Sequence, residues 1–96
     1  MDIIRSTHAS KRAQQRGIPL LIQEWLLAYG EEKYDHRGGV VHYFSRASLR
    51  VLEKAVGRDP IRRLSDYLDA YLVASTHDGT VITVGKRYRS VRILNH

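Results

Sequence analysis

The pair Asp78-Gly79 lies between two runs of β-branched and apolar residues, and this pattern constrains the fold more than any other in the chain. Asp-Gly is among the strongest short-range hairpin signals, because glycine readily adopts the positive φ angle that a tight turn requires. We therefore predict antiparallel strands over residues 71–76 and 80–85. An isolated hairpin is only marginally stable in water, so further strands or helices must pack against it.

A second hairpin is predicted between residues 33–37 and 40–44. Gly38 and Gly39 lie between the two segments and can supply the positive φ angles of a tight turn. Two hairpins in one short chain favour a single antiparallel sheet.

The first half of the chain also contains two predicted helices. One spans residues 6–15, begins at a Ser6 or Thr7 cap and ends at Gly17. The next has Pro19 in its first turn, where the missing N–H costs nothing. Because it is apolar around most of its surface, we expect this second helix to be the central one.

Two further helices are predicted between the hairpins. Ser45 or Ser48 can cap the third, which ends at Gly57, and Asp59-Pro60 begins the fourth. The fourth is predicted from apolar residues that recur at intervals of three, four and three, namely Ile61, Leu64, Leu68 and Tyr71. The fold class is therefore α+β in the order ααββααββ, an antiparallel sheet of two hairpins with two N-terminal helices and an inserted helical pair.

The length of 96 residues fits a single domain over residues 1–96, with one core. Six residues on the apolar sides of strongly patterned elements are expected to be buried: Trp25, Leu26, Leu64, Leu68, Val73 and Ile82. The chain has no cysteine, which excludes disulfides and thiolate metal sites and suits a reducing cytosol. The longest mostly apolar run, residues 18–29, is too short to span a bilayer, so we expect a cytoplasmic protein without a membrane partner.

The charge is distributed unevenly. Sixteen Lys and Arg against ten Asp and Glu give a formal net charge of +6, which favours a polyanionic partner such as RNA or DNA. Residues 3–23 and 79–96 carry basic residues and no acidic ones. The middle of the chain mixes both signs and is interpreted as ordinary solvated helix surface. Reversing Arg12 and Arg16 is thus expected to weaken nucleic-acid binding more than reversing Arg50 and Lys54.

The first predicted helix carries a candidate site. His8, Arg12 and Arg16 are spaced i, i+4, i+8 and so share one helix face. Guanidinium groups bind phosphate oxygens in pairs, and a histidine of near-neutral pKa can transfer a proton during attack by a ribose 2′-hydroxyl. The alternative is a structural role, in which the arginines pair with acidic residues of the following hairpin, Glu31, Glu32 or Asp35.

A second candidate site follows the last predicted strand. Lys86, Arg87, Tyr88 and Arg89 form a basic run around one aromatic residue, which suits contacts to a nucleic-acid backbone together with base stacking. Metal-independent ribonucleases need such a mixture to stabilise the phosphorane. The alternative is a solvated chain end without a ligand.

Other residues are assigned no ligand. His42 shares its strand face with Val40 and Phe44 and is interpreted as a buried histidine bonded to a neighbour. No His-x-x-x-His or Glu-x-x-His pair is present on a helix, so no metal site is predicted. No phosphate-binding glycine motif is present either, so no cofactor is predicted.

Two segments resemble a known family. The run His8-Ala9-x-x-Arg12-x-x-x-Arg16-Gly17-Ile18 and the sequence Asp-Gly-Thr-Val-Ile-Thr-Val at residues 78–84 resemble small bacterial domains of unknown function that look related to RelE- and ParE-type toxins. The resemblance covers both ends of the chain, and residues 45–69 form a helical segment that short members lack. It implies a compact antiparallel sheet with two N-terminal helices, and either cleavage of messenger RNA on the ribosome or binding to a protein such as gyrase. It assigns no catalytic residues.

The sequence thus predicts a toxin-like domain that interacts with nucleic acid, with metal-independent endoribonuclease activity as the candidate reaction. His8 or Tyr88 would transfer protons. The residues expected to bind phosphates are Arg12, Arg16, Lys86, Arg87 and Arg89. The expected partners are RNA or the ribosome, and a cognate protein inhibitor. The alternative is a noncatalytic protein-interaction module of the same fold, whose charge maintains solubility.

Overall fold

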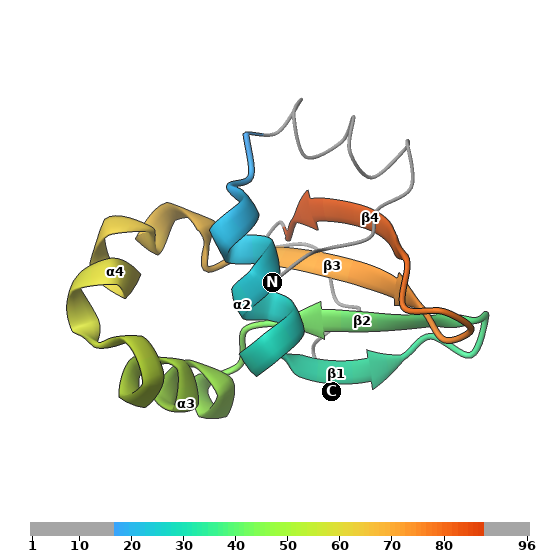
Figure 1. Ribbon diagram of the computed structural model, residues 1–96, viewed down its shortest axis with the longest axis horizontal. Helices are drawn as coiled ribbons and strands as arrows, with labels where there is room; N and C mark the ends of the chain where they lie inside the picture. Colours follow the sequence, from blue (N-terminus) through green and yellow to red (C-terminus); the bar gives the residue numbers. More distant parts are fainter. Residues whose placement is uncertain (1–16, 88–96) are drawn as a thin grey trace.

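The computed structural model describes residues 17–87. These residues form one four-stranded antiparallel sheet in the order β1-β2-β3-β4, with α2 across one face and α3 and α4 beyond one end (Figure 1). The described elements follow each other in the order αββααββ, which confirms the α+β class. The first helix of the predicted order, residues 6–15, lies outside the described residues.

Helix α2 spans Leu20–Tyr29, as its apolar pattern predicts. The carbonyl of Pro19 accepts hydrogen bonds from the N–H groups of Ile22 and Gln23 at 3.1 and 3.3 Å, so proline immediately precedes the first turn. At the other end the Gly30 N–H donates to the carbonyl of Leu26 at 3.0 Å. The chain then turns directly into the sheet.

The first hairpin joins β1 (Glu31–Tyr34) to β2 (Gly39–Tyr43) and differs from the prediction in its turn. The carboxylate of Asp35 accepts from the N–H groups of Arg37 and Gly39 at 2.6 and 2.9 Å. This side chain takes the place of a ladder partner and ends β1 at Tyr34, so the predicted strand over residues 33–37 is wrong. Gly38 has a φ of 88°, whereas Gly39 belongs to β2 and pairs with β3.

Helix α3 spans Arg46–Val56 and has the predicted caps. The Ser45 hydroxyl accepts from the Ser48 N–H at 3.0 Å, while the Ser48 hydroxyl accepts from the Ser45 N–H at 2.8 Å. This reciprocal pair satisfies two backbone donors at the helix start. Gly57 ends the helix with a φ of 87°.

The fourth predicted helix is much shorter than expected. Helix α4 spans only Arg58–Arg63, and a 3₁₀ turn, η1, follows over Ser65–Tyr67. Tyr71, which the helical spacing included, instead lies in β3 opposite Tyr43 of β2. Pairing with a strand distant in sequence thus outweighs a local helical pattern.

The second hairpin confirms its prediction to within one residue at each strand. It joins β3 (Ala70–Ser75) to β4 (Val81–Lys86), and Gly79 has a φ of 76°. The Asp78 carboxylate accepts from the Thr80 N–H at 2.9 Å, which fixes the turn. The local turn residues Asp78 and Gly79 therefore predict both strands correctly.

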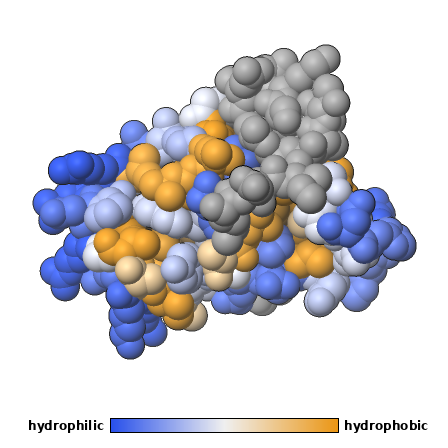
Figure 2. All heavy atoms as spheres, in the orientation of Figure 1, coloured by the Kyte–Doolittle hydropathy of each residue, from blue (hydrophilic) through white to orange (hydrophobic). Residues whose placement is uncertain are grey.

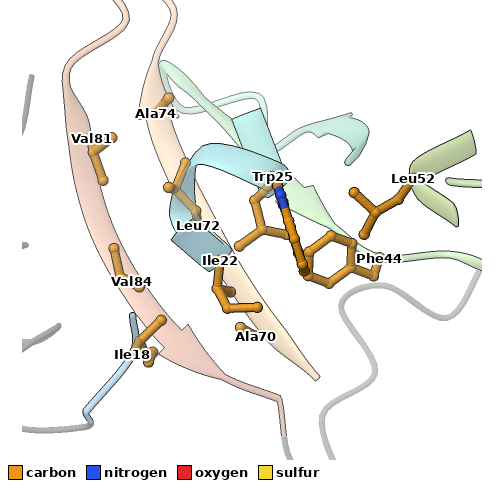
Figure 3. Packing of buried hydrophobic residues seen from close by; sticks show 11 residues of the cluster. Ile18, Ile22, Trp25, Phe44, Leu52, Ala70, Leu72, Ala74, Val81 and Val84 are labelled. Atoms are coloured by element: carbon orange, nitrogen blue, oxygen red, sulfur yellow. The ribbon is translucent and has the colours of Figure 1, made fainter. Parts of the chain in front are cut away.

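The core lies between α2 and the sheet (Figure 3). Trp25 and Leu26 are buried as predicted. They belong to a cluster that the helix, the sheet and α3 share: Ile18, Ile22, Trp25, Leu26, Phe44, Leu52, Ala70, Leu72, Ala74, Val81 and Val84. Leu64 and Leu68 pack against this cluster and are only partly buried.

Two of the predicted core residues lie elsewhere. Leu72 and Ala74 face α2, so Val73 between them projects from the opposite face of β3 and is partly exposed. Ile82 is 41% exposed, because a register shift opposite Val73 and Ala74 lets Val81 and Val84 both enter the core. The prediction that Val73 and Ile82 belong to the core is therefore wrong.

Two leucines of α2 provide a direct test of this packing. Leu26 is fully buried, whereas Leu21 on the same helix is 44% exposed. Leu26→Ala should lower the free energy of unfolding by about 2 to 5 kcal/mol, because it leaves a cavity beneath the helix. Leu21→Ala should change it by less than about 1 kcal/mol. Urea unfolding of both variants measures the difference, and equal losses would contradict the observed orientation of α2.

Candidate nucleic-acid interface

The structure describes two of the seven predicted site residues. His8, Arg12, Arg16, Tyr88 and Arg89 lie outside the described residues. Lys86 and Arg87 lie at the end of β4, beside the residues that begin β3. The candidate interface is therefore built from the surroundings of these two cations.

Lys86 is held between an acidic and an aromatic side chain. Its Nζ lies 3.7 Å from Oδ1 of Asp69 and 5.7 Å from the centroid of the Tyr67 ring. The side chains of Lys86 and Asp69 are 35% and 46% exposed, so solvent weakens the ion pair and a competing anion can reach the ammonium group. These contacts hold the Lys86 side chain in position before any ligand binds, and its ammonium group remains accessible to an anion from solvent.

Arg87 reaches across the end of the sheet. Its N–H donates to the carbonyl of Asp69 at 2.7 Å, which extends the β3–β4 ladder by one residue. Its Nη2 donates to the carbonyl of Phe44 at the end of β2 at 3.2 Å, and its guanidinium carbon lies 5.7 Å from the centroid of the Tyr43 ring. Lys86 and Arg87 therefore reach different partners, as strand alternation predicts.

Two buried polar atoms at this position lack a hydrogen-bond partner among residues 17–87. They are Nε of Arg87 and Oδ1 of Asp69. Together with Lys86, Tyr67 and Tyr43, these two residues form what we call the β4-end cluster. Of these groups, the half-exposed ammonium of Lys86 is the one that an additional anionic oxygen can reach.

Glu31 connects the neighbouring residues of β1, β2 and α3. The Tyr43 hydroxyl donates to its Oε2 at 3.2 Å and the Ser45 hydroxyl donates to its Oε1 at 2.6 Å. Burial, followed by the negative charge of Glu31, raises the pKa of Tyr43. Tyr43 is therefore protonated at neutral pH and can donate a hydrogen bond, but it is a poor general base.

His42 is a buried histidine, as the sequence predicts. It is 7% exposed and belongs to the face of β2 that packs under α2. Burial lowers its pKa, while Glu32 and a hydrogen bond to the Leu26 carbonyl act in the opposite direction. Its Nδ1 has no hydrogen-bond partner among residues 17–87. The neutral ring thus belongs to the core and lies away from the β4-end cluster.

The described part of the chain holds little of the net charge. Residues 17–87 contain ten basic and nine acidic residues, so residues 1–16 and 88–96 together contribute +5 of the total +6. Within residues 17–87 the basic residues concentrate in α3 and α4. Hydrophilic residues cover this end of the molecule, and a second hydrophilic group covers the opposite end, where the hairpin turns lie (Figure 2).

Sequence reasoning missed several members of the interface. The sheet register brings Glu31 beside Tyr43. The turn before β3 brings Asp69 and Tyr67 beside Lys86. The sequence did contain a signal for one of these contacts, that of Glu31 with Tyr43, because the predicted antiparallel hairpin brings the start of β1 beside the end of β2. The reach of Arg87 to Phe44, 43 residues away in sequence, had no local signal.

Residues 17–87 show neither a metal-binding group nor a membrane-spanning helix. In this part of the chain no group of three or more histidine and acidic side chains is arranged to hold a metal ion. No helix in the same range has the length and apolar character needed to cross a membrane.

Comparison with known proteins adds no relative. No protein-family model, no curated protein sequence and no solved structure matches the chain.

The buried His42 predicts a defined pH dependence. Its pKa lies below the unfolded value of 6.5, so between these two values the unfolded chain binds more protons than the folded one. The free energy of unfolding should therefore fall as the pH drops below about 6.5. His42→Gln should reduce this pH dependence, whereas His77→Gln, at an exposed hairpin turn, should retain it. Urea unfolding between about pH 5 and 8 measures both, and identical pH profiles would contradict the assignment.

Proposed function

We propose that this domain binds nucleic acid, with RNA as the expected polymer, and that it has a toxin-like, RelE-like function. The observation that supports this proposal best is the pair of cations at the end of β4, each within 5.7 Å of a tyrosine ring centroid. Cations bind the phosphate backbone and aromatic rings stack on bases, so their combination suits a single strand.

The local contacts suggest how a phosphate would bind. Lys86 can exchange its half-exposed Asp69 partner for a phosphate oxygen at small cost, because such an ion pair contributes at most about 1 kcal/mol. Arg87 keeps its bond to Phe44, which holds the guanidinium in place, and offers further donors. The basic residues Arg89 and Arg92 follow directly in the sequence.

The proposal extends to RNA cleavage without a metal ion. A ribose 2′-hydroxyl would attack the adjacent phosphorus, give its proton to a base and expel the 5′-oxygen, which takes a proton from an acid. His8 and Tyr88 remain the proposed proton carriers, and the arginines and Lys86 would stabilise the phosphorane. Tyr43 donates its one proton to Glu31, so its ring rather than its hydroxyl would be offered to a bound base.

The alternative function, a noncatalytic protein-interaction module, is favoured by one observation. Leu20 and Leu21 at the start of α2 are 49% and 44% exposed, so two large apolar side chains face solvent side by side. Binding of a protein inhibitor or target at this position would not need the cations of β4.

Binding of a labelled single-stranded RNA over a salt series tests the proposal. Affinity should fall steeply as salt rises, because each phosphate contact releases condensed counterions. Lys86→Gln should weaken binding and reduce the salt slope by about 0.7. Arg37→Gln, which removes the same charge from the exposed turn at the other end of the sheet, should have a smaller effect. Absence of salt-dependent binding by the wild type would contradict the proposal.

Cleavage is tested separately by incubation with RNA in the presence of EDTA. Activity should persist, and His8→Ala or Tyr88→Phe should slow it by about 10²- to 10⁴-fold if the residue carries the proton. Should neither variant slow cleavage by even about tenfold, the assigned proton carriers are wrong. If the wild type binds RNA and leaves it intact, the domain is a binding module without nuclease activity.

A further inference from the structure

Helix α3 carries a row of three cations on one face. Arg46, Arg50 and Lys54 are spaced i, i+4, i+8 and all three are exposed. Residues four apart in a helix project from the same side, about 6 Å from one another along the axis. We call these three residues the α3 stripe. The remaining apolar side of the helix contributes Leu52 to the core.

Contacts within residues 17–87 do not account for the α3 stripe. Glu53 and Asp59, the acidic residues of α3 and α4, bind Arg58 at 3.1 Å and Arg62 at 3.6 Å. No ion pair within residues 17–87 involves a residue of the stripe. Like charges one turn apart repel each other. Arg46 in the first turn also opposes the helix dipole, whereas Lys54 in the last turn favours it. An external anion would relieve the repulsion among the three cations.

Charge in the described part of the chain is segregated toward this helix. Residues 46–63 contain six basic and two acidic residues, a net charge of +4. The remainder of residues 17–87 contains four basic and seven acidic residues, a net charge of −3. A shallow open depression lined by Arg50, Glu53 and Lys54 lies along α3. The net positive charge of residues 17–87 thus lies in the segment that forms α3 and α4, at one end of the molecule (Figure 1).

The α3 stripe begins beside the β4-end cluster. Arg46 follows two residues after Phe44, whose carbonyl holds Arg87. Ser45, between them, is fixed both as the cap of α3 and as a donor to Glu31. The start of the stripe therefore adjoins the end of β2, to which Arg87 is also attached through the Phe44 carbonyl.

We propose that the α3 stripe is a second phosphate-backbone site, which binds RNA or DNA along α3 through Arg46, Arg50 and Lys54. A row of separate point charges fits the repeating phosphates of a polymer better than a single phosphate group. This inference rests on the proposed nucleic-acid binding and deepens it. It also reverses the expectation that Arg50 and Lys54 contribute less because they belong to a mixed-charge segment.

The test compares two triple variants with equal loss of charge. The first is Arg46→Gln, Arg50→Gln and Lys54→Gln. Its control is Arg58→Gln, Arg62→Gln and Arg63→Gln in the neighbouring helix, where Arg58 and Arg62 already have acidic partners. Glutamine is a good helix former, so both variants should fold, and urea unfolding confirms this. Binding to single-stranded RNA and to DNA of the same length is measured over about 50 to 200 mM salt.

The α3 stripe variant should weaken binding for every sequence tested and lower the salt slope by about 2, since single strands lose about 0.7 per phosphate contact. The control should change the slope by less than half as much. Equal effects of the two variants would show that only net charge matters. That result would overturn the proposal that the α3 stripe is a phosphate-backbone site, and it would leave the proposed function intact. Loss restricted to RNA or to DNA identifies the natural polymer. Failure of the wild type to bind either polymer would overturn both proposals.

Discussion

Ile22, Trp25 and Leu26 of α2 pack with Leu72 of β3 and Val84 of the edge strand β4, and removing this contact would leave a thin sheet with no core. Because strand side chains alternate, covering one face determines which residues of every strand are buried and which project from the other face. It buries His42 beneath the helix and leaves Tyr43 on the opposite side beside Glu31. The position of the candidate interface is thus a consequence of where α2 packs.

The end of the sheet is held by polar contacts in place of apolar packing. Arg87 joins the end of β4 to the carbonyl of Phe44, and Ser45 joins the start of α3 to Glu31 of β1. These bonds involve residues distant in sequence, so they form only once the strands are in register. They tie the last strand and the start of α3 to the same place, the end of the β1–β2 pair.

The ion pairs of residues 17–87 contribute little to the stability of the fold. Two of the three are exposed and the Lys86–Asp69 pair is half-exposed, and such pairs are typically worth at most about 1 kcal/mol. Arg46, Arg50 and Lys54 have no acidic partner in this part of the chain. The two proposals therefore rest on different cations: the first on Lys86 and Arg87 beside tyrosine rings, and the second on the row of cations along α3.

The sequence by itself determined the elements whose signals are local. Capping at Ser45, the Asp78-Gly79 turn and the apolar pattern of α2 each act within a few residues, and each prediction was confirmed. The Asp35 turn is also local, since its carboxylate bonds reach only to Gly39, but the glycine pair alone did not predict it. Only the tertiary structure decided the rest. Tyr71 joined β3 opposite Tyr43, and a register shift placed Ile82 in solvent. The candidate interface depends on the same kind of information, because Arg87, Phe44 and Glu31 meet through strand register, and register arises from burying one face of the sheet rather than from any nearby residue.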